Sequence, residues 1–151
     1  MKIVIPCGGK KRDTACAARD MYVGGYFKQC LNYALSLTKD ENIFILSAKY
    51  GFLKLSDTIS PYNVRFGDKG DIPQQAINAS AQKHGLNGPV LVIGGKDYVD
   101  RAIKAIPSSV SLLKLIGASI KGRGIGYQME WLKNNHGKNP LNKNHGAVNA
   151  E

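Results

Sequence analysis

The residues best suited to chemistry gather in one segment, FILSAKYGFLKLSDTISPY, which spans residues 44–62. The apolar run Ile43–Leu46 leads into it and favours a buried β-strand. Polar side chains that donate or accept hydrogen bonds then crowd the loop that follows: Ser47, Lys49, Tyr50, Asp57, Ser60 and Tyr62. Loops after strands often carry binding and catalytic groups. The segment is therefore predicted to contribute to a functional site.

Asp57 is the one carboxylate in this segment. A carboxylate among cations stays ionised, so Asp57 is predicted to act as a general base, orient a water molecule or stabilise a developing cation. Lys49 and Tyr50, directly after the strand, complete the predicted catalytic set. A turn or capping role for Asp57 is the alternative. Tyr50 and Tyr62 are predicted to stack on a nucleobase, a contact worth roughly 1–3 kcal/mol, with packing at the core or rim as the alternative.

Apolar runs and helical spacing indicate the elements that must position these groups. Strands are predicted at Lys2–Pro6, Ile43–Ser47, Val90–Gly94 and Ser111–Ile116. Apolar stripes predict helices between and after them, around residues 27–35, 72–79, 99–106 and 127–132. The alternation predicts an α/β fold, a three-layer sandwich with a mostly parallel sheet of about four strands.

The chain of 151 residues has room for one domain. We expect residues 1–134 to form this single α/β domain. Residues 135–151 contain few apolar side chains and many Asn and Gly. They are therefore predicted to be a flexible polar tail.

In open parallel sheets, ligands bind beyond the carboxyl ends of the strands. Each predicted strand is followed there by glycine and by at least one cation, as in PCGGKKR, GGKDY and GASIKGRGIGYQ. The GGKDY segment is predicted to bind an anion at the start of a helix, with a simple tight turn as the alternative. The predicted substrate-binding residues are Cys7, Gly8, Gly9, Ser47, Tyr62, Gly94, Gly95 and Gln128. The predicted nucleic-acid-binding residues are Lys10, Lys11, Arg12, Arg65, Lys96 and Arg123.

Cys7 follows a predicted strand and precedes three cations. Neighbouring cations make a thiol a better nucleophile, but no histidine lies near Cys7 in the sequence, and a structural cysteine is the favoured interpretation. The three cysteines and three histidines match no common metal spacing, so no metal site is predicted. No phosphate-loop or complete dinucleotide fingerprint occurs, and no cofactor is predicted.

The net charge of +10 is the strongest compositional signal. It favours a polyanionic partner, chiefly a nucleic acid or a phosphorylated small molecule, with a solubilising surface as the alternative. No apolar run is long enough for a membrane span or a signal peptide. We therefore expect a cytoplasmic protein with no membrane partner, and predict no oligomeric state.

The segment Ile45–Gly67, ILSAKYGFLKLSDTISPYNVRFG, resembles the L-S-G-x-Y-G-[LF]-L-x-x-x-D-x-I-x-P-Y-x-x-x-x-G segment of the YaaA family of cytosolic stress proteins. Ser47, Tyr50, Asp57 and Tyr62 fall in register, while Ala48 stands where the family usually has glycine. This resemblance implies DNA binding linked to protection from oxidative damage. Small relatives with a PCGKK start are similar to proteins encoded near DNA-modification and phage-related genes. The predicted sheet also resembles that of uracil-DNA glycosylases, at the level of fold alone.

These observations favour a nucleic-acid-directed enzyme that acts on an N-glycosidic bond, like a DNA glycosylase, with modified bases among its substrates. A non-catalytic DNA-binding module, in stress protection or of phage origin, is one alternative. An enzyme on a free nucleotide or another phosphorylated small molecule is the other. In each case the expected partner is an anion, and DNA is the preferred one.

Overall fold

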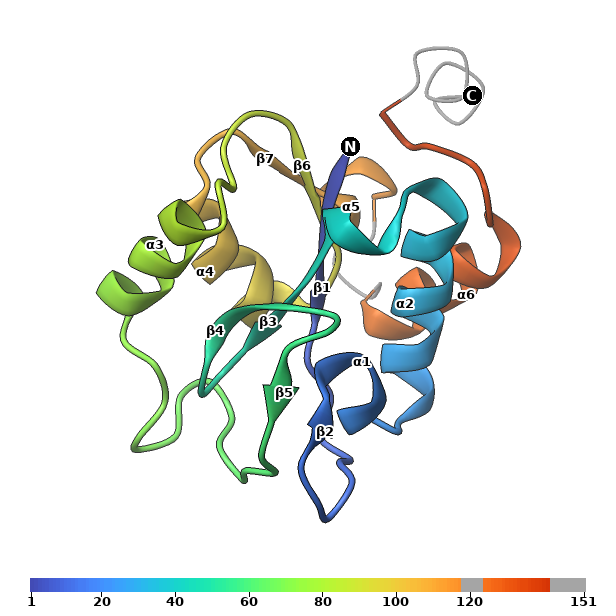
Figure 1. The fold of residues 1–151 in the computed structure, drawn as a ribbon. Helices are drawn as coiled ribbons and strands as arrows, with labels where there is room; N and C mark the ends of the chain where they lie inside the picture. The colour runs from blue at the N-terminus through green and yellow to red at the C-terminus, as the bar shows by residue number, and fades with distance from the viewer. Residues whose placement is uncertain (118–123, 142–151) are drawn as a thin grey trace.

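The computed structural model describes residues 1–117 and 124–141, and its core is a five-stranded sheet in the order β4-β3-β1-β6-β7 (Figure 1). The strands are β1 (Lys2–Pro6), β3 (Ile43–Ser47), β4 (Gly51–Lys54), β6 (Val90–Val92) and β7 (Ser109–Ser111). Only β4 runs antiparallel to its neighbour within this sheet. The predicted α/β fold with a mostly parallel sheet is therefore confirmed, with one strand more than about four. A two-stranded ribbon pairs β2 (Cys16–Ala17) with β5 (Thr58–Ile59).

Alternating side chains of the central strands build a core on each face of the sheet. Ile3 and Ile5 of β1 pack toward Phe27, whereas Val4 packs on the other face with Ile77 and Val99. Helices α2 and α6 cover the first face, and α3 and α4 cover the second (Figure 1). The helices are α1 (Ala18–Met21), α2 (Gly25–Leu37), α3 (Gln74–Lys83), α4 (Lys96–Ala105), α5 (Leu112–Leu115) and α6 (Ile125–Asn134), with a 3-10 turn at Asp40–Asn42.

Two strand predictions need correction. The strand predicted at Ser111–Ile116 is wrong beyond its first residue, because β7 ends at Ser111 and α5 follows. The Ser111 hydroxyl accepts a hydrogen bond from the Lys114 N–H at 3.3 Å and caps that short helix. The third predicted strand ends at Val92, two residues early.

Strand β4 was not predicted. It returns antiparallel to β3 through a turn that ends at Gly51, whose φ of +78° favours glycine. A Cβ at Gly51 would also lie 3.1 Å from the Ser80 hydroxyl. The FLK run of β4 is too short to stand out from the loop in sequence.

The predicted flexible tail begins too early. Within residues 135–141, the Lys138 carbonyl accepts a hydrogen bond from Tyr33 Oη at 2.7 Å, and the Gly137 N–H donates to Ser36 Oγ at 2.8 Å. Pro140 is buried. This stretch therefore packs on α2, and the rest of the predicted tail, residues 142–151, lies outside the described residues. No helix in the described part of the chain could cross a membrane.

Candidate functional site

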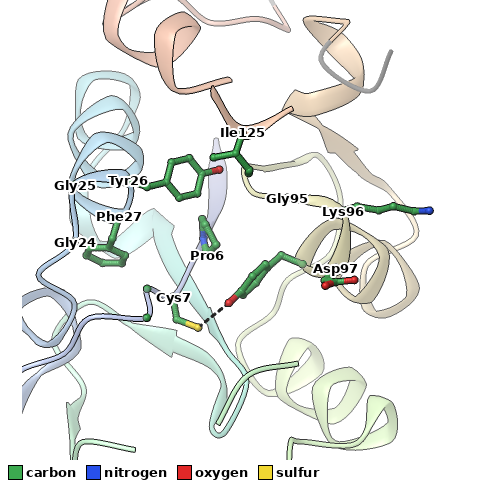
Figure 2. Close-up of a pocket in the computed structure, with 13 residues that line it drawn as sticks. Pro6, Cys7, Gly24, Gly25, Tyr26, Phe27, Gly95, Lys96, Asp97 and Ile125 are labelled. Carbon is green, nitrogen blue, oxygen red and sulfur yellow. Dashed lines mark hydrogen bonds between the residues drawn. The ribbon is translucent and has the colours of Figure 1, made fainter. Parts of the chain in front are cut away.

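A cavity of about 470 Å³ opens where β1 and β6 end (Figure 2). We call it the Cys7 cavity, and it is lined by Pro6, Cys7, Gly8, Gly9, Gly24, Gly25, Tyr26, Phe27, Gly95, Lys96, Asp97, Tyr98 and Ile125. Its walls come from the loop after β1 and from the first residues of three helices. This is the edge of the sheet where the sequence predicts ligand binding. Its volume is within the usual range of small-molecule sites.

A second hollow of about 310 Å³ adjoins the Cys7 cavity. We call it the Arg65 hollow, and it is lined by Cys7, Gly8, Gly9, Lys11, Val64, Arg65, Phe66, Asp97 and Tyr98. Cys7, Asp97 and Tyr98 line both spaces. The two spaces therefore meet around one thiol, one carboxylate and one phenol.

Three helices begin at the Cys7 cavity: α2 after Gly24, α4 after Gly95 and α6 after Gly124. The first N–H groups of a helix lack partners within it, and the helix dipole adds partial positive charge there. At Gly24 and Gly25, an added Cβ would meet no heavy atom within 4 Å. The backbone at the start of α2 is thus open to a ligand.

Aromatic side chains wall both spaces. Tyr26, Phe27 and Tyr98 line the Cys7 cavity, and Phe66 lines the Arg65 hollow. The rings of Phe66 and Tyr98 meet edge to face with centroids 5.1 Å apart. Burial raises the pKa of Tyr26 and of Tyr98 above the ordinary range, so both phenols keep their protons at neutral pH.

Cys7 lies between the two spaces. Its thiol is hydrogen-bonded to Tyr98 Oη, with Sγ and Oη 3.3 Å apart (Figure 2), and the residue is 8% exposed. Its N–H donates to the Leu46 carbonyl at 3.1 Å and extends the pairing of β1 with β3. The strand end therefore fixes the thiol in place. Cys7 was correctly placed at the predicted edge, although its predicted contact with a substrate stays a prediction.

Lys11 is the cation most closely linked to Cys7. Burial lowers the pKa of Lys11, a negative charge on Cys7 opposes that shift, and the positive charge of Arg65 adds to it. Lys11 Nζ lies 4.4 Å from the centroid of the Tyr62 ring. Lys11 and Arg65 both line the Arg65 hollow, as expected for the predicted cationic rim.

Asp97 is the carboxylate shared by the linings of the Cys7 cavity and the Arg65 hollow. It is exposed, in the first turn of α4, where a negative charge suits the helix dipole. The neighbouring Lys96 side chain extends away from Cys7 and Tyr26 (Figure 2). The sequence singled out this segment for its glycines. Gly95 does line the Cys7 cavity, and Asp97 and Tyr98 line both spaces.

The polar residues of the segment 44–62 mostly bond to one another. Ser47 Oγ accepts from the N–H groups of Lys49 and Tyr50 at 3.1 and 3.0 Å, and its hydroxyl donates to Tyr62 Oη at 2.8 Å. Tyr62 Oη in turn lies 2.6 Å from Tyr22 Oη. We call Ser47, Tyr50, Tyr62 and Tyr22 the Ser47 cluster. None of the four lines the Cys7 cavity or the Arg65 hollow, so base stacking on Tyr50 and Tyr62 stays a prediction that neither space supports.

Asp57 is engaged in a turn. Its carboxylate accepts a hydrogen bond from the Lys54 N–H at 2.8 Å, and its own N–H donates to the Lys54 carbonyl at 3.2 Å. Asp57 lines neither space, and neither does Lys49, whose Nζ lies 5.3 Å from the Tyr50 ring centroid. These contacts favour the alternative of a turn residue, and the catalytic role of Asp57 has no geometric support.

Gln128 is a structural clamp. It is wholly buried, its Oε1 accepts from the Gly94 N–H at 3.1 Å, and its Nε2 donates to the Gly94 carbonyl at 3.0 Å. Tyr26 Oη also donates to Oε1 at 3.3 Å. The predicted ligand contacts of Gln128 and of the buried Gly94 are therefore not supported. Their pairing instead ties α6 and Tyr26 to the end of β6.

The remaining predicted cations are dispersed. Lys10 is exposed and lines neither space, while Arg12 Nε donates to the Asp20 carbonyl at 2.8 Å. Arg123 lies outside the described residues. Gly24, Gly25 and Tyr26, which the sequence analysis did not select, carry the glycine-then-helix pattern that was recognised in GGKDY. That pattern was the available signal for them.

Comparison with known proteins gives a family and no activity. No curated protein and no solved structure matches the chain. Among the described residues, no group of three His, Cys, Asp or Glu is arranged to hold a metal ion. One family model matches, over residues 3–134, which is most of the chain. The chain belongs to this family, DUF6884, a family of unknown function.

Proposed function

We propose that the protein is an enzyme that breaks or exchanges the N-glycosidic bond of a nucleotide unit in DNA. The observation that carries the proposal is the Cys7 cavity, where three helix N-termini, aromatic walls and the carboxylate of Asp97 converge. Helix N-termini suit a phosphate and aromatic walls suit a base. A cavity that received only phosphate would gain nothing from a carboxylate. Asp97 therefore argues for chemistry in which positive charge develops.

Breaking an N-glycosidic bond produces such charge at the sugar, and a nearby carboxylate stabilises it. Asp97 takes this role in place of Asp57. Tyr26, Phe27 and Tyr98 provide apolar and phenolic surface for an everted base. Lys11 and Arg65, in the adjoining hollow, lie where the flanking phosphates of a strand would pass. The net charge of +10 supports a polyanionic substrate.

An enzyme on a free nucleotide is the second candidate. The convergence of three helix N-termini on one cavity favours it, because a terminal phosphate carries more charge than a phosphodiester. Both candidates use the same cavity. They differ in whether the Arg65 hollow holds the continuing strand.

The test is to incubate the protein with unmodified DNA, with base-modified DNA and with free nucleotides, and to measure released base by mass spectrometry. Release from DNA that Asp97→Asn abolishes is the expected result. Release from free nucleotides alone would favour the second candidate.

No release, with salt-sensitive DNA binding, would leave a binding module. In that case the slope of log K against log salt counts the phosphate contacts at about −0.9 each for duplex DNA.

A further inference from the structure

We infer that Cys7 is the covalent nucleophile of this site and attacks C1′ of the nucleotide, with Tyr98 and Lys11 as its positioning partners. The inference rests on the proposed function. Three observations carry it: Cys7 lines both the Cys7 cavity and the Arg65 hollow, its Sγ is 3.3 Å from Tyr98 Oη, and Lys11 lies in the same hollow.

The surroundings of Cys7 differ from those of the other two cysteines. Cys30 faces the core, where burial raises its pKa to about 12, so its thiol is inert at neutral pH. Cys16 lies half-buried in β2 and lines neither space. Cys7 alone of the three meets an open cavity, a hydroxyl and a cation together.

The two partners have separate tasks. The Lys11 ammonium stabilises the negative charge that develops on sulfur as the thiol gives up its proton, because opposite charges attract at short range in a partly buried site. The Tyr98 hydroxyl keeps its proton, since burial raises its pKa, and it is therefore able to pass a proton between the thiol and the ligand.

The reaction balances without any further reagent. Sulfur forms a bond to C1′ as the C1′–N bond breaks, and the electron pair of that bond leaves with the base nitrogen. The thiol proton reaches the departing base through the Tyr98 hydroxyl. Water then displaces sulfur from C1′, which restores the thiol and leaves a hydroxyl on the sugar. Asp97 stabilises the positive charge on the sugar in both steps.

The first experiment measures thiol reactivity and needs no substrate. The full chain is treated with iodoacetamide, and alkylation of each cysteine is followed by peptide mass spectrometry. Exposure alone predicts that Cys16 reacts before Cys7. If Cys7 is the nucleophile, it should react about tenfold faster than Cys16, because a neighbouring cation assists the attack by sulfur.

Variants separate charge from packing. Lys11→Met should slow Cys7 alkylation and Lys11→Arg should restore it, whereas Lys28→Met, which removes an exposed charge on α2, should leave it unchanged. Tyr98→Phe should lower the rate and shift its pH dependence. Alkylation of Cys7 no faster than that of Cys16 overturns the inference, whatever the enzyme acts on.

The second experiment looks for the intermediate on the same DNA panel. Acid quenching and intact mass analysis should find the base-free strand attached to Cys7, and Cys7→Ser should lack both adduct and base release. Base release that persists in Cys7→Ser, or a borohydride-trapped adduct on Lys11, overturns the inference and leaves the proposed function standing. If Cys7 is alkylated rapidly but no substrate releases a base, both the proposed function and the attack on C1′ are wrong.

Discussion

The Ser47 cluster and the Cys7 cavity lie at the same edge of the sheet but use their polar groups in opposite ways. In the cluster, Ser47 makes hydrogen bonds to two backbone N–H groups and to Tyr62, whose hydroxyl also meets Tyr22. In the cavity, the backbone of Gly24 and Gly25 and the carboxylate of Asp97 face open space. A high number of polar side chains in one segment therefore does not identify a site, because those side chains can satisfy one another's hydrogen bonds.

We therefore expect the Ser47 cluster to contribute to stability and the Cys7 cavity to bind the ligand. Buried polar groups that satisfy each other hold loops in place, and losing one partner leaves the other unpaired at a cost. At the cavity wall, the Cys7 thiol and the Tyr26 hydroxyl also have partners. The backbone of Gly24 and Gly25 there lies open to a ligand. Each region can be perturbed separately, and the two should respond through different measurements.

The largest expected effect comes from neutralising the carboxylates of Asp97 and Asp57 in two separate variants. Asp97→Asn should lower base release about 10²-fold or more, because a carboxylate that stabilises developing charge is lost. Asp57→Asn should leave turnover nearly unchanged and cost about 1 kcal/mol of unfolding free energy, through a weaker bond to the Lys54 N–H. Steady-state kinetics and denaturant unfolding of both variants check this. The reverse result, with turnover lost in Asp57→Asn alone, would restore the catalytic role first predicted for that residue.

The next effect is on stability in the Ser47 cluster. Ser47→Ala removes the acceptor for two N–H groups and a partner of Tyr62, all at a wholly buried position, and should cost about 1–3 kcal/mol. Ser56→Ala, at an exposed turn position, is the matched control and should change the unfolding free energy by less than about 0.5 kcal/mol. Thermal unfolding followed by circular dichroism measures both. Equal stability of the two variants would contradict a structural cluster.

These contrasts show what the sequence could reveal. Strands β1 and β3 match their predicted bounds, since continuous β-branched runs buried on both faces are unambiguous. The Cys7 cavity and the Arg65 hollow also open at the predicted edge of the sheet, because parallel topology brings the strand ends together. The prediction for the Ser111–Ile116 run was wrong beyond Ser111, because a short apolar run fits a strand or a helix equally well.

The site residues were harder to predict for a physical reason. Asp57 and Asp97 each lie within three residues of a lysine, one in a turn and one in the first turn of a helix, and nothing local tells which one has a backbone donor to bind. Gln128 was selected for its chemistry, but its burial depends on how α6 meets β6. Long-range packing decides which polar groups stay available, and one sequence carries little of that information.

A smaller effect should follow from filling the Cys7 cavity with a side chain. Gly25→Leu places a side chain where no heavy atom beyond the adjacent residues and the helix backbone lies within 4 Å of the new Cβ. It should weaken nucleotide monophosphate binding about tenfold by occupying the ligand's space. Gly126→Leu is the matched control, because this glycine also lies in the first turn of a helix, has the same open surroundings and lines neither space. Calorimetric titration and thermal unfolding together measure the outcome. Equal affinity of both variants would place the ligand elsewhere.

The smallest effect is a pH dependence that belongs to stability alone. Burial lowers the pKa of His84, whose ring nitrogen lies 3.0 Å from the Phe52 carbonyl in β4, the strand that follows the Ser47 cluster. Because the unfolded state then binds the proton more tightly, stability should fall as pH drops through the ordinary histidine range near 6.5. The group is largely solvent-screened, so the loss should stay under about 1 kcal/mol. Denaturant unfolding of the wild type and of His84→Gln should be followed from about pH 7.5 to about pH 5. The free energy of unfolding should fall less in the variant than in the wild type. The pH profile of base release should be the same in both proteins, and a changed profile in His84→Gln would couple this region to the site.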